Sequence, residues 1–275
     1  MGRVITVCNQ KGGTGKTTSA INLAAYLALA GKKVLLVDLD PQGNATSGSG
    51  INKHSVEKST YHVLLEEMDV QEILQPTEIN GFYLAPANLD LTGAEVELVS
   101  VLGRENRLKK ALLKEKENFD FIFIDSPPSL GLLTINALCA ADSVLVPVQC
   151  EYYALEGVTQ LVNTINLIKN NLNPELVIEG VLLTMADFRT NLTKEVIQEV
   201  RNHFKNKVYR TIIPRSIRLT EAPSFGKPVA LYDKDSLGAK KYEELAKEIL
   251  CLDISLSSLD NSVSEKIAGQ TESGE

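Results

Sequence analysis

Residues 12–17 combine glycines, a lysine and a threonine in a spacing suited to binding phosphate. They read Gly-Gly-Thr-Gly-Lys-Thr, after an apolar run of strand length and before a helical pattern. Glycines let backbone N–H groups approach an anion, and the start of the following helix adds its positive end. Lys16 is expected to neutralise the outer phosphates and Thr17 to ligate Mg²⁺. A plain glycine turn would explain the glycines but not Lys16 and Thr17 beside them.

Three carboxylates end two further apolar runs. Asp38 and Asp40 belong to "VLLVDLDPQGN", and Asp125 ends "FIFID". In an extended chain residues two apart project on the same face. Ligands of open α/β sheets lie at the carboxyl ends of the strands, so these acids are expected to meet the phosphate loop. There they would hold Mg²⁺ through water and position a water molecule for attack. Acids at strand ends also cap helices or solubilise loops, and that alternative stays open for each one alone.

Apolar runs of strand length alternate with helical patterns along the chain, which is typical of βαβ units. The expected fold is α/β, with a single doubly wound, mostly parallel sheet and helices on both faces. The expected strands are residues 4–8, 33–39, 82–85, 119–125, 143–148, 177–184 and 209–213. The expected helices are residues 16–30, 104–117, 155–169, 191–205 and 237–250.

The boundaries of the folded part follow from composition. Residues 1–250 are predicted to form one domain, and residues 43–58, rich in Gly, Ser and Asn, a loop. The serine-rich, acidic residues 251–275 are predicted to be a disordered tail. No apolar stretch reaches the ~18 residues of a membrane span, and the chain runs directly into a strand, so a cytoplasmic protein is expected.

Charge and cysteine usage exclude some function classes. The net charge of −7 argues against a protein coated all round with nucleic acid. The four cysteines are far apart and form no C-x-x-C pair, so neither a metal cluster nor a disulfide framework is expected. One local basic patch is visible between residues 201 and 227. Its members are Arg201, Lys205, Lys207, Arg210, Arg215, Arg218 and Lys227.

Five motifs together resemble the ParA/Soj chromosome- and plasmid-partition ATPases of the deviant Walker A (MinD/ParA) class. They are "KGGTGKTT", "VDLDPQGN", "IDSPPSLGLLTINAL", "PVQCEYYALEG" and "IPRSIRLTEAPSFGKP", and the likeness covers about residues 2–250. The resemblance implies a P-loop NTPase with ATP and Mg²⁺ as cofactors. It also implies slow ATP hydrolysis that DNA and a partner stimulate, and a homodimer that forms with ATP.

The resemblance also implies roles for single residues. Lys11 would reach across the dimer to the nucleotide of the partner subunit, although a solvated loop lysine is the alternative. Asp40 would position the attacking water, with Asp38 and Asp125 supporting the metal shell. Thr14 departs from the family's usual valine and is expected to point away from the phosphates. The full cofactor-binding set implied is Lys11, Gly12, Gly13, Thr14, Gly15, Lys16, Thr17, Thr18 and, near adenine, Pro214.

The basic residues between positions 201 and 227 could form only a solvated face, and that alternative stays open. Arg189 and Arg218, however, match arginines that bind DNA without sequence preference in Soj-like relatives. Such binding would be to phosphates and strongly salt-dependent. The implied partners are nucleoid DNA and a ParB/Spo0J-like centromere-binding protein, and the implied output is chromosome or plasmid segregation. A membrane-cycling, MinD-like division-site ATPase would need a basic amphipathic helix, which the tail lacks. An iron–sulfur reductase would need paired cluster cysteines from each subunit, and the surroundings of Cys139 and Cys150 do not match those of such cysteines. A DNA-binding scaffold with a vestigial ATP site would not need the residues of an ATP site to be intact, as they are here.

Overall fold

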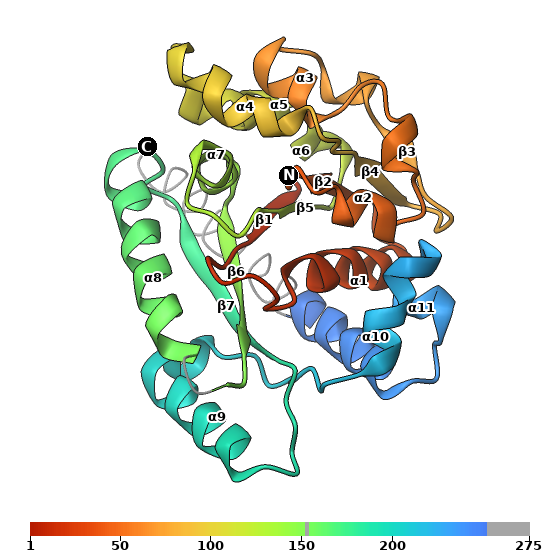
Figure 1. The fold of residues 1–275 in the computed structure, drawn as a ribbon, viewed down its shortest axis with the longest axis vertical. Helices are drawn as coiled ribbons and strands as arrows, with labels where there is room; N and C mark the ends of the chain where they lie inside the picture. Colours follow the sequence, from red (N-terminus) through yellow and green to blue (C-terminus); the bar gives the residue numbers. More distant parts are fainter. Residues whose placement is uncertain (152–153, 252–275) are drawn as a thin grey trace, which may run out of the picture.

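Seven strands form one sheet in the order β3-β4-β2-β5-β1-β6-β7 (Figure 1). The computed structural model describes residues 1–151 and 154–251. All neighbouring strands are parallel except β3, which pairs with β4 in the antiparallel sense. The mostly parallel sheet predicted from the sequence is therefore confirmed. The strands are β1 (Arg3–Val7), β2 (Val34–Asp38), β3 (Gln75–Pro76), β4 (Phe82–Ala85), β5 (Phe121–Asp125), β6 (Ser143–Gln149) and β7 (Val177–Thr184).

Alternate residues of the central strands enter two separate cores, one on each face. In β5, Ile122 and Ile124 pack on one face, and Phe121 and Phe123 on the other. Strands buried on both faces need apolar side chains at every position, which explains their unbroken hydrophobic runs.

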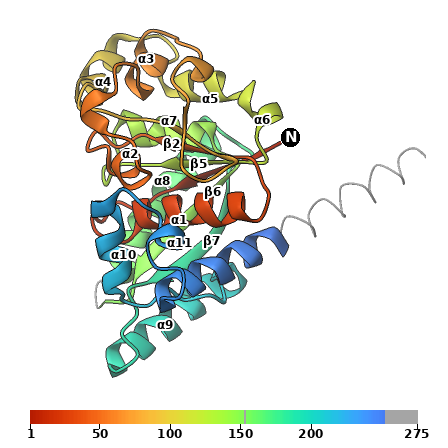
Figure 2. The same cartoon turned by 90° about the vertical axis from the view of Figure 1, so that its right-hand side faces the viewer.

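The helices divide between these two faces, as a doubly wound fold requires. The first face is covered by α3 (Thr60–Leu65), α4 (Leu91–Glu97), α5 (Arg107–Leu112), α7 (Leu132–Ala140), α8 (Ala154–Asn171) and α9 (Asn191–Phe204). The second face is covered by α1 (Lys16–Leu29), α2 (Asn44–Gly48), α10 (Ile217–Glu221), α11 (Val229–Tyr232) and a helix over residues 237–251. Figure 2 shows this last helix, in blue, beside α1. The Tyr242 hydroxyl meets the Ser19 hydroxyl of α1 at 3.0 Å. A short α6 (Glu115–Asn118) follows α5.

Short 3₁₀ turns connect many of these elements. They are η1 (Lys53–Ser55), η2 (Val70–Glu72), η3 (Leu98–Ser100), η4 (Arg104–Asn106), η5 (Lys205–Lys207) and η6 (Ala222–Phe225). The predicted disordered tail, from residue 252 on, lies outside the described residues.

Two predictions of local structure were wrong because side chains redirect backbone hydrogen bonds. The predicted loop 43–58 contains α2, since the Thr46 N–H and hydroxyl both donate to Asp38 Oδ2, at 2.8 and 2.7 Å. The predicted helix 104–117 is divided into η4, α5 and α6. There Asn136 takes both halves of one helical hydrogen bond, accepting from the Leu108 N–H and donating to the Arg104 carbonyl.

Residues 209–213 are not a strand, also against the prediction. The segment touches β7 at two points, where the Tyr209 N–H donates to the Val181 carbonyl and the Ile213 N–H to the Leu183 carbonyl. Between them, the N–H groups of Arg210 and Thr211 donate to the carboxylate of Glu248 instead, at 2.8 and 3.1 Å. The acid from the helix of residues 237–251 thus replaces the ladder of an eighth strand.

Candidate functional site

The loop between β1 and α1 is held open by glycine backbone and pinned by polar side chains. Gly13 and Gly15 adopt φ of 74° and 88°, a left-handed region that favours glycine. Buried Asn9 donates to the Pro147 carbonyl at 2.6 Å and accepts from the Lys11 N–H at 3.1 Å. The Thr184 hydroxyl of β7 donates to the Thr14 carbonyl at 2.8 Å. The loop is therefore fixed to β6 and β7 before α1 begins.

Lys16, the first residue of α1, is buried at the centre of this loop. Its ammonium donates to the Lys11 carbonyl at 3.2 Å. Burial lowers the pKa of Lys16, and the charges of Asp125, Cys8 and Asp40 act in the opposite direction. A buried ammonium facing acids and a glycine loop is an anion-binding arrangement.

Asp38 and Asp125 stand opposite each other on β2 and β5 at the carboxyl ends of these strands. Asp38 is fully engaged, because it accepts two hydrogen bonds from Thr46 and one from the Asp40 N–H at 3.1 Å. Burial raises the pKa of Asp38 to about 6, and these hydrogen bonds oppose the shift. Asp38 therefore fastens α2 to β2, in addition to any role in a metal shell.

Asp125 differs from Asp38 because neither of its buried oxygens has a hydrogen-bond partner of normal geometry among the described residues. Burial and the charge of Asp38 raise the pKa of Asp125 well above its usual value, although Thr17 and Lys16 favour its charged form. A buried carboxylate without partners fits a site that receives a cation.

A direct metal site built from protein side chains alone does not exist in the described part of the chain. No group of three His, Cys, Asp or Glu side chains there is placed to hold a metal ion. Mg²⁺ would therefore need the Thr17 hydroxyl, phosphate oxygens and water, with Asp125 behind them.

Two cavities meet at the glycine loop. The first, of about 430 Å³, is lined by loop residues, by Asp40 and by Pro128. The second, of about 330 Å³, is lined by Pro214, Ile213 and Tyr242 among others. Gly15, Thr18, Met185 and Pro223 line both. One cavity beside the phosphate loop and one beside Pro214 thus adjoin one another, and both are in the size range of small-molecule sites.

The structure brings most of the predicted site residues together. The first cavity is lined by the predicted Gly12, Gly13, Gly15, Lys16, Thr17, Thr18 and Asp40, and the second by Pro214. Thr14 and Lys11 line neither cavity. The Thr14 side chain is buried, and its hydroxyl donates to the Lys11 carbonyl at 3.4 Å.

Lys11 points out of the loop. Its ammonium lies 3.6 Å from Glu151 Oε2, and 43% of its side chain is exposed. Glu151 also pairs with Arg215, at 3.3 Å through Oε1. Lys11 is thus free to move without disturbing the phosphate loop, because both contacts are at the surface.

The predicted DNA-binding arginines lie apart from the cavities. Arg189 follows β7 and pairs with Asp187 through two hydrogen bonds, of 2.8 and 2.6 Å. Arg218, on α10, pairs with Glu221 at 3.0 Å and Asp233 at 3.1 Å. The two segments that carry these arginines adjoin, because Ala186 bridges Pro214.

Sequence reasoning missed three contributors to the site. Asn9 and Thr184 hold the loop, and Met185 lines both cavities with a φ of 52°, which is uncommon for a residue other than glycine. No spacing in the sequence points to Thr184 and Met185, because they lie at and just after the end of a buried strand that is distant in sequence from the loop.

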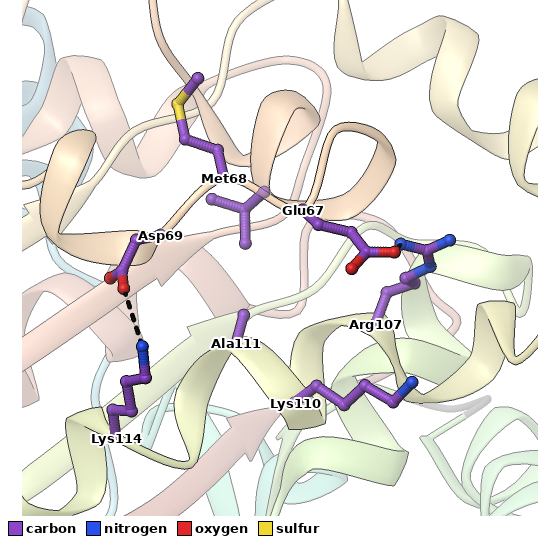
Figure 3. Close-up of a pocket in the computed structure, with 8 residues that line it drawn as sticks. Glu67, Met68, Asp69, Arg107, Lys110, Ala111 and Lys114 are labelled. Carbon is purple, nitrogen blue, oxygen red and sulfur yellow. Dashed lines mark hydrogen bonds and ion pairs between the residues drawn. The ribbon is translucent and has the colours of Figure 1, made fainter.

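A third cavity is separate from this site (Figure 3). Its volume is about 170 Å³, and it lies between α5 and the segment after α3. Ion pairs of Glu67 with Arg107 and of Asp69 with Lys114 stand at its two ends. It is smaller than ordinary ligand sites, and none of the predicted site residues lines it.

The class of P-loop NTPases is defined by a parallel sheet with a glycine-rich phosphate loop between β1 and α1. Acids at the ends of β2 and β5 complete this arrangement here. A family profile described as "AAA domain" matches residues 2–178. The sporulation initiation inhibitor protein Soj of Bacillus subtilis is 59% identical over 249 residues, which are 90% of this chain and 98% of that protein. The chain therefore belongs to the ParA/Soj family of chromosome-partitioning ATPases, and the resemblance stated above is confirmed.

Two further relatives agree with this assignment. The chromosome partitioning protein ParA of Myxococcus xanthus is 56% identical over 250 residues, which are 91% of this chain and 88% of that protein. The crystal structure of cobyrinic acid a,c-diamide synthase from Mycobacterium smegmatis with bound ATP analog and magnesium superposes with a TM-score of 0.80. It is 40% identical and covers 91% of this chain and 95% of that one. None of the helices in the described residues has the length and apolar character needed to cross a bilayer.

Proposed function

We propose that this protein is a partition ATPase that binds ATP with Mg²⁺, closes into a homodimer and binds DNA without sequence preference. The observation that carries the proposal is the loop with buried Lys16 facing unpartnered Asp125, where two cavities meet. Phosphates would occupy the first cavity and the base the second, near Pro214. The reaction is hydrolysis of ATP to ADP and phosphate.

The chain's own residues supply positioning and charge in this reaction. The loop N–H groups and Lys16 would hold the phosphates, and Thr17 and Asp125 would hold Mg²⁺, which offsets negative charge on the triphosphate when bound. Asp40 lines the phosphate cavity, and its Oδ1 accepts the Gln42 N–H at 2.9 Å. That hydrogen bond fixes the carboxylate, so that its other oxygen is left to orient a water molecule.

Lys11 carries the dimer part of the proposal. It lines neither cavity in its own subunit, and its side chain is exposed beside Glu151. A lysine at this place could stabilise the triphosphate of a second subunit, where its charge acts only when both subunits and ATP are present. Hydrolysis would remove that charge complementarity and let the subunits separate.

DNA binding by Arg189 and Arg218 follows from the same assembly. Each protomer offers a small group of arginines, and a dimer doubles the number of phosphate contacts, so affinity would depend on ATP through effective concentration. A ParB-like partner would stimulate hydrolysis and thereby release the dimer from the nucleoid. Chromosome or plasmid segregation would be the biological result.

The synthase named for one similar structure offers a different activity. That chain is 40% identical, whereas the relatives named for sporulation control and chromosome partitioning reach 59% and 56% over similar lengths. The higher identity supports partitioning. The membrane-cycling alternative has no supporting observation in the described residues.

The test uses light scattering of the full chain with Mg²⁺ and ATP. Lys11→Ala is expected to bind ATP like the parent but to stay monomeric, because the phosphate loop does not depend on its side chain. Lys234→Ala, at an exposed position away from the loop, is the matched control and should dimerise normally. A Lys11→Ala variant that dimerises like the parent would show that the cross-subunit role is wrong.

A further inference from the structure

The basic patch predicted for residues 201–227 is divided in the folded chain. Arg215 and Arg218 lie beyond the carboxyl end of β7, near Arg189. Lys227 follows η6 and pairs with Glu78. The remaining four lie in or beside η5: Val208 bridges Val181 in the middle of β7, and the chain before it lies toward the amino end of that strand. We call Arg201, Lys205, Lys207 and Arg210 the η5 cluster.

The side chains of the η5 cluster are exposed and without carboxylate partners. All four residues are exposed, and within the described chain none of them forms an ion pair. Glu248 is the acid that contacts this segment. Its carboxylate oxygens accept hydrogen bonds from the N–H groups of Arg210 and Thr211 and from the Thr211 hydroxyl. Glu248 therefore binds two N–H groups and a hydroxyl rather than the Arg210 guanidinium.

The arginines at the carboxyl end of β7, in contrast, all form ion pairs. Arg189 pairs with Asp187, Arg215 with Glu151, and Arg218 with Glu221 and Asp233. A phosphate that binds there must displace a carboxylate, at a cost of about 0.2–1 kcal/mol for each exposed pair. The η5 cluster carries no such competition.

The backbone that carries the η5 cluster is tightly packed against β7. Tyr209 is buried, and the ring leaves no room for a side chain at Gly180, where a Cβ would lie 2.5 Å from it. Lys205 adopts a φ of 51°, which ends α9 and turns the backbone outward into η5. A strained, non-glycine conformation that the surrounding structure maintains is more frequent at functional sites.

We propose that the η5 cluster is a second polyanion-binding site, which takes the phosphate backbone of duplex DNA separately from Arg189 and Arg218. The inference rests on the proposed DNA binding and extends it to a second place on each protomer. No large apolar side chain is exposed between residues 201 and 210. The cluster could therefore attract an anionic membrane by charge, but it has no apolar side chain to insert into the bilayer. Contacts made by charge alone are those that provide non-specific DNA binding.

The test measures binding of the full chain, with Mg²⁺ and a non-hydrolysable ATP analogue, to a labelled duplex of mixed sequence over a range of salt. The variant carries Lys205→Gln, Lys207→Gln and Arg210→Gln. The slope of log affinity against log salt should fall by about 1–3 per protomer, because each lost phosphate contact removes about 0.9. The matched control, Lys109→Gln, Lys110→Gln and Lys114→Gln on and just after α5, removes the same charge elsewhere and should keep the parent slope.

The outcomes separate this inference from the function on which it rests. A η5 variant with the slope and affinity of the control overturns the inference, while loss of binding in Arg189→Ala/Arg218→Ala then still supports DNA binding. A parent protein that binds no DNA overturns both. If the η5 variant keeps the DNA slope but loses binding to phosphatidylglycerol vesicles, the cluster is a lipid site and the inference is wrong.

Discussion

The unpartnered state of Asp125 leads to a prediction in which stability and ligand binding change in opposite directions. Asp125→Asn keeps the shape of the side chain but removes a carboxyl group that has no hydrogen-bond partner among the described residues and that faces Asp38. At pH 8 the parent must either bury a charge there or keep a proton that the unfolded chain releases. Both cost free energy of folding, and the asparagine avoids this part of the cost although its amide is buried at the same place.

The expected size follows from the burial. Because the asparagine amide is equally buried, only the cost of the charge or of the retained proton differs, and a pKa raised by one above that of the unfolded chain corresponds to about 1.4 kcal/mol at a pH above both values. For a chain of this size 1 kcal/mol shifts Tm by about 2–4 °C, so nucleotide-free Asp125→Asn should melt at least about 3 °C above the parent. With Mg²⁺ and ATP at about 100 times Kd, the parent gains about 2.7 kcal/mol, and the variant should lose the part that depends on Mg²⁺.

The pH dependence of the stability provides a second test with the same variant. Because the folded-state pKa of Asp125 is raised, its contribution is favourable at low pH and is lost as pH rises through that pKa. The parent should therefore lose stability from about pH 4 upward more steeply than Asp125→Asn, and the two should converge below about pH 4. Asp38, whose pKa burial raises to about 6, remains in both proteins, but it should ionise more easily in the variant because the charge of Asp125 no longer opposes it.

Scanning calorimetry with and without nucleotide at several pH values makes the measurement. Asp235→Asn, the same change at an exposed position, is the control and should shift Tm little. A nucleotide-free Asp125→Asn that melts below the parent at pH 8, or that keeps the full Mg²⁺-dependent gain, would refute the reasoning.

Two other variants test the loop and the chemistry. Thr184→Val removes the hydrogen bond to the Thr14 carbonyl while keeping the side-chain shape, and should weaken ATP binding about 5–10-fold, as titration with a fluorescent ATP analogue would show. An unchanged affinity would mean that β7 does not hold the loop. Asp40→Ala should bind ATP nearly normally but release phosphate about 100-fold more slowly and stay on DNA. Phosphate release at the parent rate would remove Asp40 from the reaction.

The sheet and the phosphate loop were predictable because their signals are local. Strands such as β2 and β5 are unbroken apolar runs, and the glycines of the loop directly precede the helix that they start. The convergence of Asp38 and Asp125 also followed, since both end parallel strands. These features depend on neighbours in sequence or on the general geometry of open sheets.

What could not be predicted depends on side chains distant in sequence. Asn136 divides the helix expected over residues 104–117, and Glu248 keeps residues 209–213 out of the sheet. The division of the basic patch follows from the second case, because that segment carries the chain from η5 to the opposite end of β7. Each outcome depends on a polar side chain that captures backbone groups from more than 25 positions away, and no local pattern contains this information.

The groups that we propose to act on ATP follow three strands in the middle of the sheet, β2, β5 and β1. The edge strands β3 and β4 and the helices α3, α4 and α5 supply none of these groups, so they are free to change over evolutionary time while the proposed chemistry stays intact. Substitutions at the edge of the sheet could therefore give related proteins new cargo, new regulators or a different cellular location without changing the residues proposed for hydrolysis.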